Sequence, residues 1–270
     1  MARGQGGSTA IPMKRMYFLL SPNCNLKCAY CFQLENPVEV ASAPGYHAQP
    51  RLRASRRVID ALARYCLDNG VKHVEFFGGE PLMYRQEFMY AVRTLCKSVP
   101  GMTVGVVTNG TLFDEQLMDF FESHPVSVLL SLEGGRERHD AFRGGFDCIA
   151  RWVPRLVAKG RTTIATQVGK AEGLRDGVRA VWRMGFPRVY TNIIDKYGWY
   201  APGEVAVFER EYAGLIDDML AGKGELLCAL QLHGSLARSS HRQSCGVAAQ
   251  GLACDWHGRL YPCHRAMEIG

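Results

Sequence analysis

The sequence predicts an α/β fold, in which helices cover a mainly parallel β-sheet. Two observations support this prediction: short apolar segments alternate with longer amphipathic ones along most of the chain, and polar or glycine-rich segments follow several of the short ones. With 270 residues, of which 47% are hydrophobic and 21% charged, the chain can bury one sizeable core and a small appendage. No apolar run approaches the ~20 residues of a membrane-spanning helix, so we expect no membrane partner.

Six strand–helix units follow one another in the prediction. The first combines a buried strand at residues 15–20 with a helix at 55–70, which has Ser55 as its N-cap and Gly70 as its terminator. The fourth helix contains Pro154, which is expected to kink it. Six units fall short of the eight in a complete (β/α)8 barrel. The remaining strands are predicted at 71–79, 102–110, 126–135, 161–168 and 188–195, and the remaining helices at 86–101, 114–125, 146–160, 173–185 and 203–222.

Unusual polar segments follow the first four predicted strands. They read CNLKCAYC, GGEP, TNG and SLEGG in chain order. Because the carboxyl ends of parallel strands meet at one edge of a sheet, where active sites are assembled, we expect these segments to converge on one site.

The first of these segments places Cys24, Cys28 and Cys31 in a C-x3-C-x2-C spacing. The N-terminus, MARGQGGSTA, is polar and has no apolar core of signal-peptide length, so we expect a reducing, cytoplasmic location and no disulfides. Structural zinc prefers four ligands, which these cysteines alone do not supply. A four-iron cluster held by three thiolates would leave one iron open to a ligand from outside the protein.

The ordered set of motifs resembles the radical S-adenosylmethionine (SAM) superfamily over roughly residues 15 to 200. The resemblance implies a partial (β/α)6 TIM-like barrel with a small cysteine-rich C-terminal extension. It also implies a [4Fe–4S] cluster on the three cysteines, whose fourth iron binds the amino and carboxylate groups of SAM. The motifs that carry it are Cys24, Cys28, Cys31 and Phe32, then Gly78-Gly79-Glu80-Pro81, then Thr108-Asn109-Gly110, then Ser131-Leu132-Glu133-Gly134 with His139-Asp140 and Arg143.

Roles for the cofactor-binding residues follow from the same resemblance. Gly78 and Gly79 would let the backbone approach the methionine ammonium group, and Glu80 would accept a hydrogen bond there. The remaining expected contacts are Asn109 and Ser131 with the ribose, Arg143 with the methionine carboxylate, and Tyr30 to Phe32 with the adenine. Two alternatives stay open: Thr108-Asn109-Gly110 can be a simple turn, and Arg143 can be a surface charge.

The C-terminal segment carries a second set of cysteines. Cys245, Gly258 and Cys263 resemble the opening C-x(9-15)-G-x4-C signature of the SPASM or twitch extension, which binds auxiliary iron–sulfur clusters. The later cysteines of that extension do not follow, so we expect either a truncated chain or a shortened form that binds a partial or partner-completed cluster. Further candidate ligands are Cys254 and Cys228. The alternative is a zinc ribbon formed by Cys245, Cys254, Cys263 and either His257 or His264.

Other cysteines and charges are expected to be structural. Cys66, Cys96 and Cys148 lie on predicted helices, where a buried small side chain is the expected role. The net charge of +6 is spread out, and no aromatic–basic motif accompanies the arginines, so we expect a solvated face and no nucleic acid partner. An acidic or phosphate-bearing partner is the alternative. The densest arginines are Arg51, Arg53, Arg56, Arg57, Arg136 and Arg138.

These features together predict a radical SAM enzyme that acts on a peptide or protein side chain, resembling anaerobic sulfatase-maturing enzymes and peptide maturases. In this chemistry a 5′-deoxyadenosyl radical abstracts a hydrogen atom from the substrate, and a flavodoxin or ferredoxin donates the electron. The alternatives are radical chemistry on a small molecule such as an aminoglycoside sugar, and a truncated metal-binding module without activity. We expect a disordered segment at 1–14, the core at 15–223 and an incomplete SPASM/twitch-like segment at 224–270.

Overall fold

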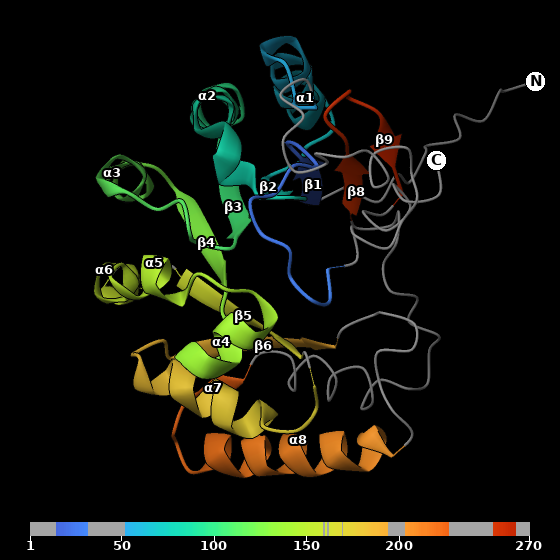
Figure 1. Cartoon of the computed structure of the whole chain (residues 1–270). Helices are drawn as coiled ribbons and strands as arrows, with labels where there is room; N and C mark the ends of the chain where they lie inside the picture. Colours follow the sequence, from blue (N-terminus) through green and yellow to red (C-terminus); the bar gives the residue numbers. More distant parts are fainter. Residues whose placement is uncertain are drawn as a thin grey trace, which may run out of the picture.

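The chain folds around one nine-stranded sheet with the strand order β7-β6-β5-β4-β3-β2-β1-β8-β9. The computed structural model describes residues 15–31, 52–158, 160, 162–168, 170–193, 203–226 and 251–262. All neighbouring strands run parallel except β8 and β9, and the sheet curves without closing (Figure 1). The predicted partial barrel of six strand–helix units is therefore confirmed. The expected disordered segment at 1–14 lies outside the described residues.

The strands are short and mostly buried. Residues of β1 to β4 that face the helices are almost entirely apolar, as expected for a parallel sheet with a covered face. Their bounds are β1 (Arg15–Leu19), β2 (His73–Phe77), β3 (Thr103–Thr108), β4 (Val126–Ser131), β5 (Thr162–Val168), β6 (Arg188–Ile193), β7 (Glu225–Leu226), β8 (Gly251–Cys254) and β9 (Leu260–Tyr261).

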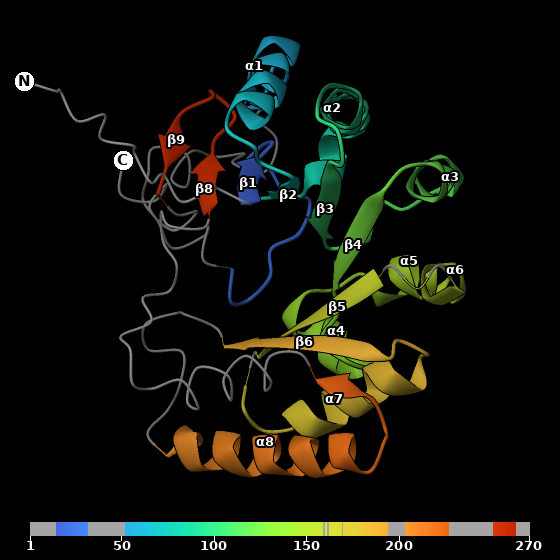
Figure 2. The same ribbon diagram turned by 180° about the vertical axis from the view of Figure 1, so that it is seen from behind.

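The helices lie along the outer face of the curved sheet (Figures 1 and 2). The core between the two layers is rich in phenylalanine: the Phe76 ring packs edge-to-face against Phe18 and Phe88, with centroids 5.6 and 5.2 Å apart. The bounds are α1 (Arg56–Asp68), the 3₁₀ helix η3 (Pro81–Tyr84), α2 (Arg85–Ser98), α3 (Glu115–Ser123), α4 (Arg136–Phe142), α5 (Phe146–Ala150), α6 (Val153–Ala158), α7 (Leu174–Arg183) and α8 (Glu204–Leu220).

Local sequence signals explain where α1 and α6 begin. Ser55 caps α1 as predicted, since its side chain accepts a hydrogen bond from the Val58 amide. The predicted kink at Pro154 is wrong, because the chain instead forms two separate helices, α5 and α6. Pro154 is the second residue of α6, a position in the first turn where a helix needs no backbone N–H.

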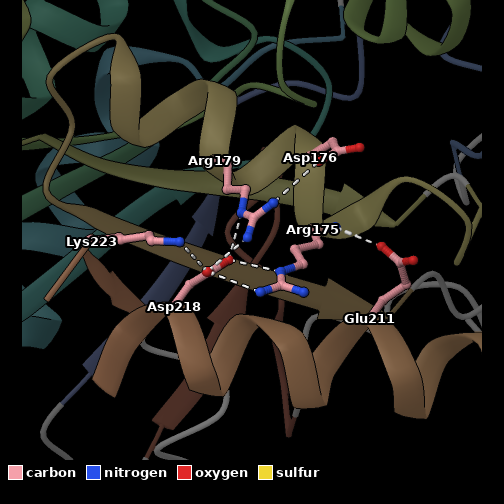
Figure 3. A network of polar contacts seen from close by, with 6 residues as sticks. All are labelled: Arg175, Asp176, Arg179, Glu211, Asp218 and Lys223. Carbon is pink, nitrogen blue, oxygen red and sulfur yellow. Dashed lines mark hydrogen bonds and ion pairs between the residues drawn. The ribbon is translucent and has the colours of Figure 1, made fainter. Parts of the chain in front are cut away.

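One buried carboxylate joins the last two helices of the core. Asp218 on α8 accepts hydrogen bonds from Arg175 and Arg179 on α7 at 2.6 to 3.0 Å, and from Lys223 at 2.8 Å (Figure 3). Gly214 leaves room for this arrangement, since a Cβ there would lie 2.4 Å from the Arg175 guanidinium. The network therefore fixes α8 against α7.

The C-terminal hairpin belongs to the same sheet as the core. Strand β8 pairs in parallel with β1, with Arg15 opposite Gly251 and Phe18 opposite Cys254. Strand β7 also extends the sheet, at residues that the sequence assigned to the tail. The expected boundary at residue 223 stays a prediction. Among the described residues, no helix has both the length and the apolar character needed to cross a membrane.

Candidate functional site

The polar segments that follow β1 to β4 do meet, as the sequence predicted. We call residues 20–31 the cysteine loop. The Gly79 amide donates to the Ser21 carbonyl at 3.1 Å, and the Ala29 amide donates to the Phe142 carbonyl at 2.9 Å. The loop is therefore held on one side by the end of β2 and on the other by the end of α4.

The two glycines after β2 make room for the cysteine loop itself. A Cβ on Gly79 would lie 1.9 Å from the Asn23 carbonyl oxygen, and one on Gly78 would lie 2.8 Å from the Ser21 carbonyl oxygen. Gly78 also has a φ of +125°, which L-residues rarely adopt. The structure shows a close approach of the cysteine-loop backbone to these glycines. The approach to the SAM ammonium group that the sequence predicted stays a prediction.

Glu80 is buried at the centre of this junction. Its carboxylate accepts hydrogen bonds from the Leu82 amide at 3.0 Å, the Thr108 hydroxyl at 2.8 Å and the Asn109 amide at 2.7 Å. Burial raises the pKa of Glu80 to about 7, although these hydrogen bonds partly offset the rise. Glu80 thus joins the ends of β2 and β3, and its expected contact with the SAM ammonium group stays a prediction.

Asn109 reaches across to the cysteine loop. Its Nδ2 donates to Asn25 Oδ1 at 2.9 Å and to Cys24 Sγ at 3.9 Å, while its Oδ1 accepts from the Thr111 amide at 3.0 Å. The segment after β3 is therefore a turn that also positions the loop, and the ribose contact stays a prediction.

Arg143 is buried in a compact polar group and is not a surface charge. Its Nε donates to Glu133 Oε1 at 3.0 Å, its Nη1 donates to Cys28 Sγ at 3.7 Å, and its guanidinium lies 5.1 Å from the centroid of the Tyr30 ring. The Tyr30 hydroxyl donates to Glu133 as well. Burial raises the pKa of Glu133, and the positive charge of Arg143 opposes that rise. The surface alternative for Arg143 is wrong.

His139 supports this group from α4. Its Nδ1 accepts a hydrogen bond from the Glu133 amide at 3.3 Å, and the imidazole is fully buried. Burial, with Arg143 nearby, lowers the pKa of His139 to about 4. The ring is therefore neutral at physiological pH.

The three thiols of the cysteine loop lie within electrostatic reach of one another. Burial raises the pKa of Cys24 to about 12, and negative charge on Glu80, Cys28 and Cys31 would raise it further. Among the described residues, no three Cys, His, Asp or Glu side chains gather as ligands of a single metal ion do. In a cluster each thiolate binds a different iron, so the fit to a cluster depends on the three neighbouring thiols and not on convergence at a single ion.

The remaining predicted core residues are partly described. Ser131 ends β4 and is buried, and Pro81 begins η3 and is buried as well. Phe32 lies outside the described residues. The ribose role of Ser131 stays a prediction.

The tail candidates are divided between the core and the undescribed residues. Cys254 is buried on β8 in the apolar core, which favours packing over metal binding, whereas His257 is exposed in the following turn. Gly258 has a φ of +87° in that turn, which explains why glycine occupies this position. The residues outside the described part are Cys228, Cys245, Cys263 and His264.

Of the helical cysteines, Cys66 is buried and Cys96 is half-buried, as expected for packing residues. Cys148 is exposed, so its expected burial is wrong. The short helix α5 turns this side chain to solvent while Ile149 enters the core.

Sequence reasoning gave no roles to Glu133, His139 and Asp255. Glu133 and His139 stand in the motif that carried the resemblance, and a carboxylate that directly follows a buried strand is the signal that could have identified the ion pair with Arg143. Asp255 is buried between β8 and β9 and accepts from the amides of His257 and Arg259, both at 2.9 Å. Its signal was an Asp at the start of a turn.

Comparison with known sequences identifies the family to which the core belongs. The model of the radical SAM superfamily matches residues 18–191. The chain is 30% identical over 157 residues to a GTP 3′,8-cyclase of Chlorobaculum tepidum, which is 57% of this chain and 44% of that protein. It is 29% identical over 140 residues to a cysteine-type anaerobic sulfatase-maturating enzyme of Clostridium novyi, covering 48% and 36%. It is also 29% identical over 142 residues to the subtilosin biosynthesis protein AlbA of Bacillus subtilis, covering 51% and 29%.

Solved structures share the fold along nearly the whole chain. Native anSMEcpe with bound AdoMet has a TM-score of 0.76 at 20% identity, covering 93% of this chain and 75% of that one. SuiB of Streptococcus suis bound to S-adenosylmethionine has a TM-score of 0.72 at 17% identity, covering 97% and 62%. Both proteins have also been solved with peptides, Cp18Cys for anSMEcpe and the precursor peptide SuiA for SuiB.

The chain spans less than half the length of these curated relatives, and the family match covers its core from β1 to β6. The partial barrel and the matched motifs both indicate the same family. The chain belongs to the radical SAM superfamily.

Proposed function

We propose that this chain is a radical SAM enzyme that modifies a side chain of a peptide or protein. The observation that carries the proposal is the extent of the fold match: anSMEcpe and SuiB, both solved with peptides, cover 93% to 97% of this chain. Similarity to the sulfatase-maturating enzyme and to AlbA supports the same substrate class.

The superfamily uses a [4Fe–4S] cluster and SAM. The three thiols and the N–H donors that face Cys24 and Cys28 suit a thiolate-bound cluster, because such donors stabilise negative sulfur. We assign the cluster to Cys24, Cys28 and Cys31. When bound and reduced, the cluster and SAM supply the 5′-deoxyadenosyl radical that abstracts a hydrogen atom from the substrate.

The chain's own residues position these groups and keep water away. Glu80 and Asn109 fix the ends of β2 and β3 against the cysteine loop, while Glu133 and Arg143 fix the end of β4. Burial of Glu80 and Glu133 makes this side of the site a low-dielectric environment, in which charge–charge interactions are strong. A flavodoxin or ferredoxin is the electron donor that we expect.

A small-molecule substrate is the second candidate, because the GTP 3′,8-cyclase of Chlorobaculum tepidum shares 30% identity with the core. One residue on the inner face of the sheet argues against a triphosphate substrate. Glu75 faces away from the helices with its carboxylate against Gly105, and it accepts from His73 at 3.0 Å. A carboxylate there would repel a phosphate group.

The test is anaerobic reconstitution of the chain with iron and sulfide, followed by reaction with SAM and a chemical reductant. We expect 5′-deoxyadenosine by liquid chromatography, and a mass change in a short peptide encoded near the gene. GTP and an aminoglycoside serve as parallel substrates. If GTP or the aminoglycoside reacts and the peptide does not, a small-molecule substrate replaces the peptide in the proposal. A fully loaded cluster that yields no 5′-deoxyadenosine would overturn the proposal that the chain is an enzyme.

The metal assignment has its own test. Cys28→Ala should remove the SAM-dependent change in the EPR spectrum of the reduced cluster, because one iron loses its thiolate. Cys148→Ala, at an exposed cysteine, is the matched control and should leave the spectrum as in the wild type. An unchanged spectrum in Cys28→Ala would show that the cluster is held elsewhere.

A further inference from the structure

Arg143 is a buried cation whose hydrogen bonds go to the chain itself. Only 9% of its side chain is exposed, and its ion-pair partner Glu133 is fully buried. One face of the guanidinium is covered by Tyr30, and Nε and Nη1 are directed to Glu133 and to Cys28 Sγ. A planar fork held at three points keeps its charge in a fixed position.

The sulfur atoms of the cysteine loop have different donors. Cys24 Sγ faces two neutral donors, the Leu26 amide at 3.4 Å and Asn109 Nδ2 at 3.9 Å. Cys28 Sγ faces a charged donor, Arg143 Nη1, at 3.7 Å. Among the donors that the structure places at these two sulfurs, the arginine alone carries a net charge.

A charge at this position acts on electron transfer. Reduction of a thiolate-bound cluster adds one electron, and hydrogen bonds to the sulfurs and the net charge nearby set its reduction potential. In a buried site the effect of a fixed positive charge is only weakly screened. A cation held at Cys28 therefore favours the reduced cluster.

We propose that Arg143 is a positioning residue that raises the reduction potential of the cluster, by donating from Nη1 to the Cys28 thiolate. This inference rests on the proposed function, because it requires a cluster on the cysteine loop. It differs from the contact with the SAM carboxylate expected from the sequence, since it acts before SAM binds. The electron comes from the flavodoxin or ferredoxin class of donor, and no bond forms or breaks in the step.

Glu133 limits the same effect. Its carboxylate holds Arg143 through Nε and also accepts from the Tyr30 hydroxyl, so its negative charge lies beside the guanidinium. Replacement of this carboxylate by an amide keeps an acceptor oxygen but removes the charge. Loss of Arg143 and loss of the Glu133 charge should therefore shift the potential in opposite directions, whereas general loosening of the site would not.

The experiment compares Arg143→Met, Arg143→Lys and Glu133→Gln with the wild type after anaerobic reconstitution. The midpoint potential of the cluster is measured by EPR-monitored redox titration without SAM or substrate, and iron content is measured in parallel. Arg136→Met is the matched control. Arg136 begins helix α4, which Arg143 directly follows, but Arg136 is exposed and paired with Asp147 at the surface.

We expect Arg143→Met to lower the equilibrium constant for reduction of the cluster about tenfold. For one electron this corresponds to a fall in the midpoint potential of about 59 mV. Arg143→Lys should fall between it and the wild type, because lysine keeps the charge without the fork. Glu133→Gln should raise the potential, and Arg136→Met should not change it. Should Arg143→Met lose its iron, Arg143→Lys takes its place in the comparison.

Two results would overturn the inference: a wild-type potential in the Arg143 variants, or shifts of the same sign in the Arg143 variants and Glu133→Gln. Weaker SAM binding in Arg143→Met with an unchanged potential would assign Arg143 to SAM alone. A wild-type chain that binds no cluster would overturn the proposed function itself, so the two failures are distinguishable.

Discussion

His139 is a buried imidazole that must stay neutral for the chain to keep its native packing. Its pKa, lowered by burial to about 4, lies below the value of about 6.5 in an unfolded chain. Between these values the unfolded state binds more protons, so the contribution of His139 to stability is complete above about pH 6.5 and falls as the pH is lowered toward 4.

Replacement of His139 should remove this pH dependence. Glutamine can still accept from the Glu133 amide, so His139→Gln keeps the hydrogen bond without the titrating group. Relative to the variant, the wild type should lose about 2 kcal/mol of unfolding free energy between pH 7.5 and pH 5. Urea denaturation of both proteins at the two pH values measures this difference.

The comparison needs the variant because Glu80 opposes the effect. Its raised pKa of about 7 makes it stabilise the fold at low pH and lose that contribution as the pH rises through the range from about 4.5 to 7. His257→Gln, at an exposed turn residue, is the matched control and should follow the wild type. A wild-type to His139→Gln difference that is the same at both pH values would contradict the prediction.

Single residues also show where sequence reasoning stops. The glycine pair at Gly78 and Gly79 indicated a close approach to the cofactor, and the structure shows one to the cysteine loop. Its partner, the backbone of Ser21 to Asn23, could not be predicted because it comes from a loop more than fifty residues earlier along the chain. In the same way Arg143 could be interpreted as a surface charge until the burial of Glu133 was known.

At the scale of elements, the pairing of α7 with α8 depends on Asp218. The carboxylate is 2% exposed, while the side chains of Arg175 and Arg179 are 33% and 29% exposed. The two guanidinium groups repel each other once the carboxylate charge is removed. The hydrogen bonds from these arginines hold the pKa of Asp218 well below its ordinary value.

Asp218→Asn should therefore lower the free energy of unfolding by about 2 to 3 kcal/mol, somewhat below the cost of breaking a fully buried pair because the arginines reach solvent. The matched control is Asp176→Asn. Asp176 is 84% exposed and 3.8 Å from Arg179, so this change should cost less than about 0.5 kcal/mol. Urea denaturation at neutral pH measures both, and equal losses would contradict a special role for Asp218.

Elements with strong periodicity were predictable from the sequence, and short ones were not. The six strands of the core and the helices that follow them appear where alternation placed them. The single helix predicted over 146–160 became α5 and α6, and α4 was taken for part of a motif. Helices of five to seven residues have too few turns to produce a periodic signal.

For the whole molecule, the metal content of the tail tests the predicted auxiliary cluster. If Cys245 and Cys263 bind an auxiliary cluster, the reconstituted chain should contain more than about four irons, the number in a single cluster. The double variant Cys245→Ala/Cys263→Ala should return to about that number. Iron and zinc analysis of both proteins measures this, with Cys96→Ala as a cysteine control from the core.

Iron–sulfur binding is favoured over zinc at the tail by the spacing of Gly258 before Cys263 and because the cysteine loop already requires an iron-loading, reducing environment. Stoichiometric zinc, with iron unaffected in the double variant, would contradict this prediction. The sequence identified the cysteines of the tail, but it gave no sign that β8 would join the core sheet, because two strands of four and two residues carry little pattern.

The pairing of β8 with β1 also bears on how the chain reaches its native state. Without β8, the strand that carries the cysteine loop would be an open edge, with unpaired N–H and C=O groups that invite association with other chains. Its partner is among the last described residues, so this edge is exposed during synthesis until the C-terminal segment emerges, and closing so long a loop is slow. Aggregation of nascent or truncated chains should therefore begin at β1, next to the cysteines.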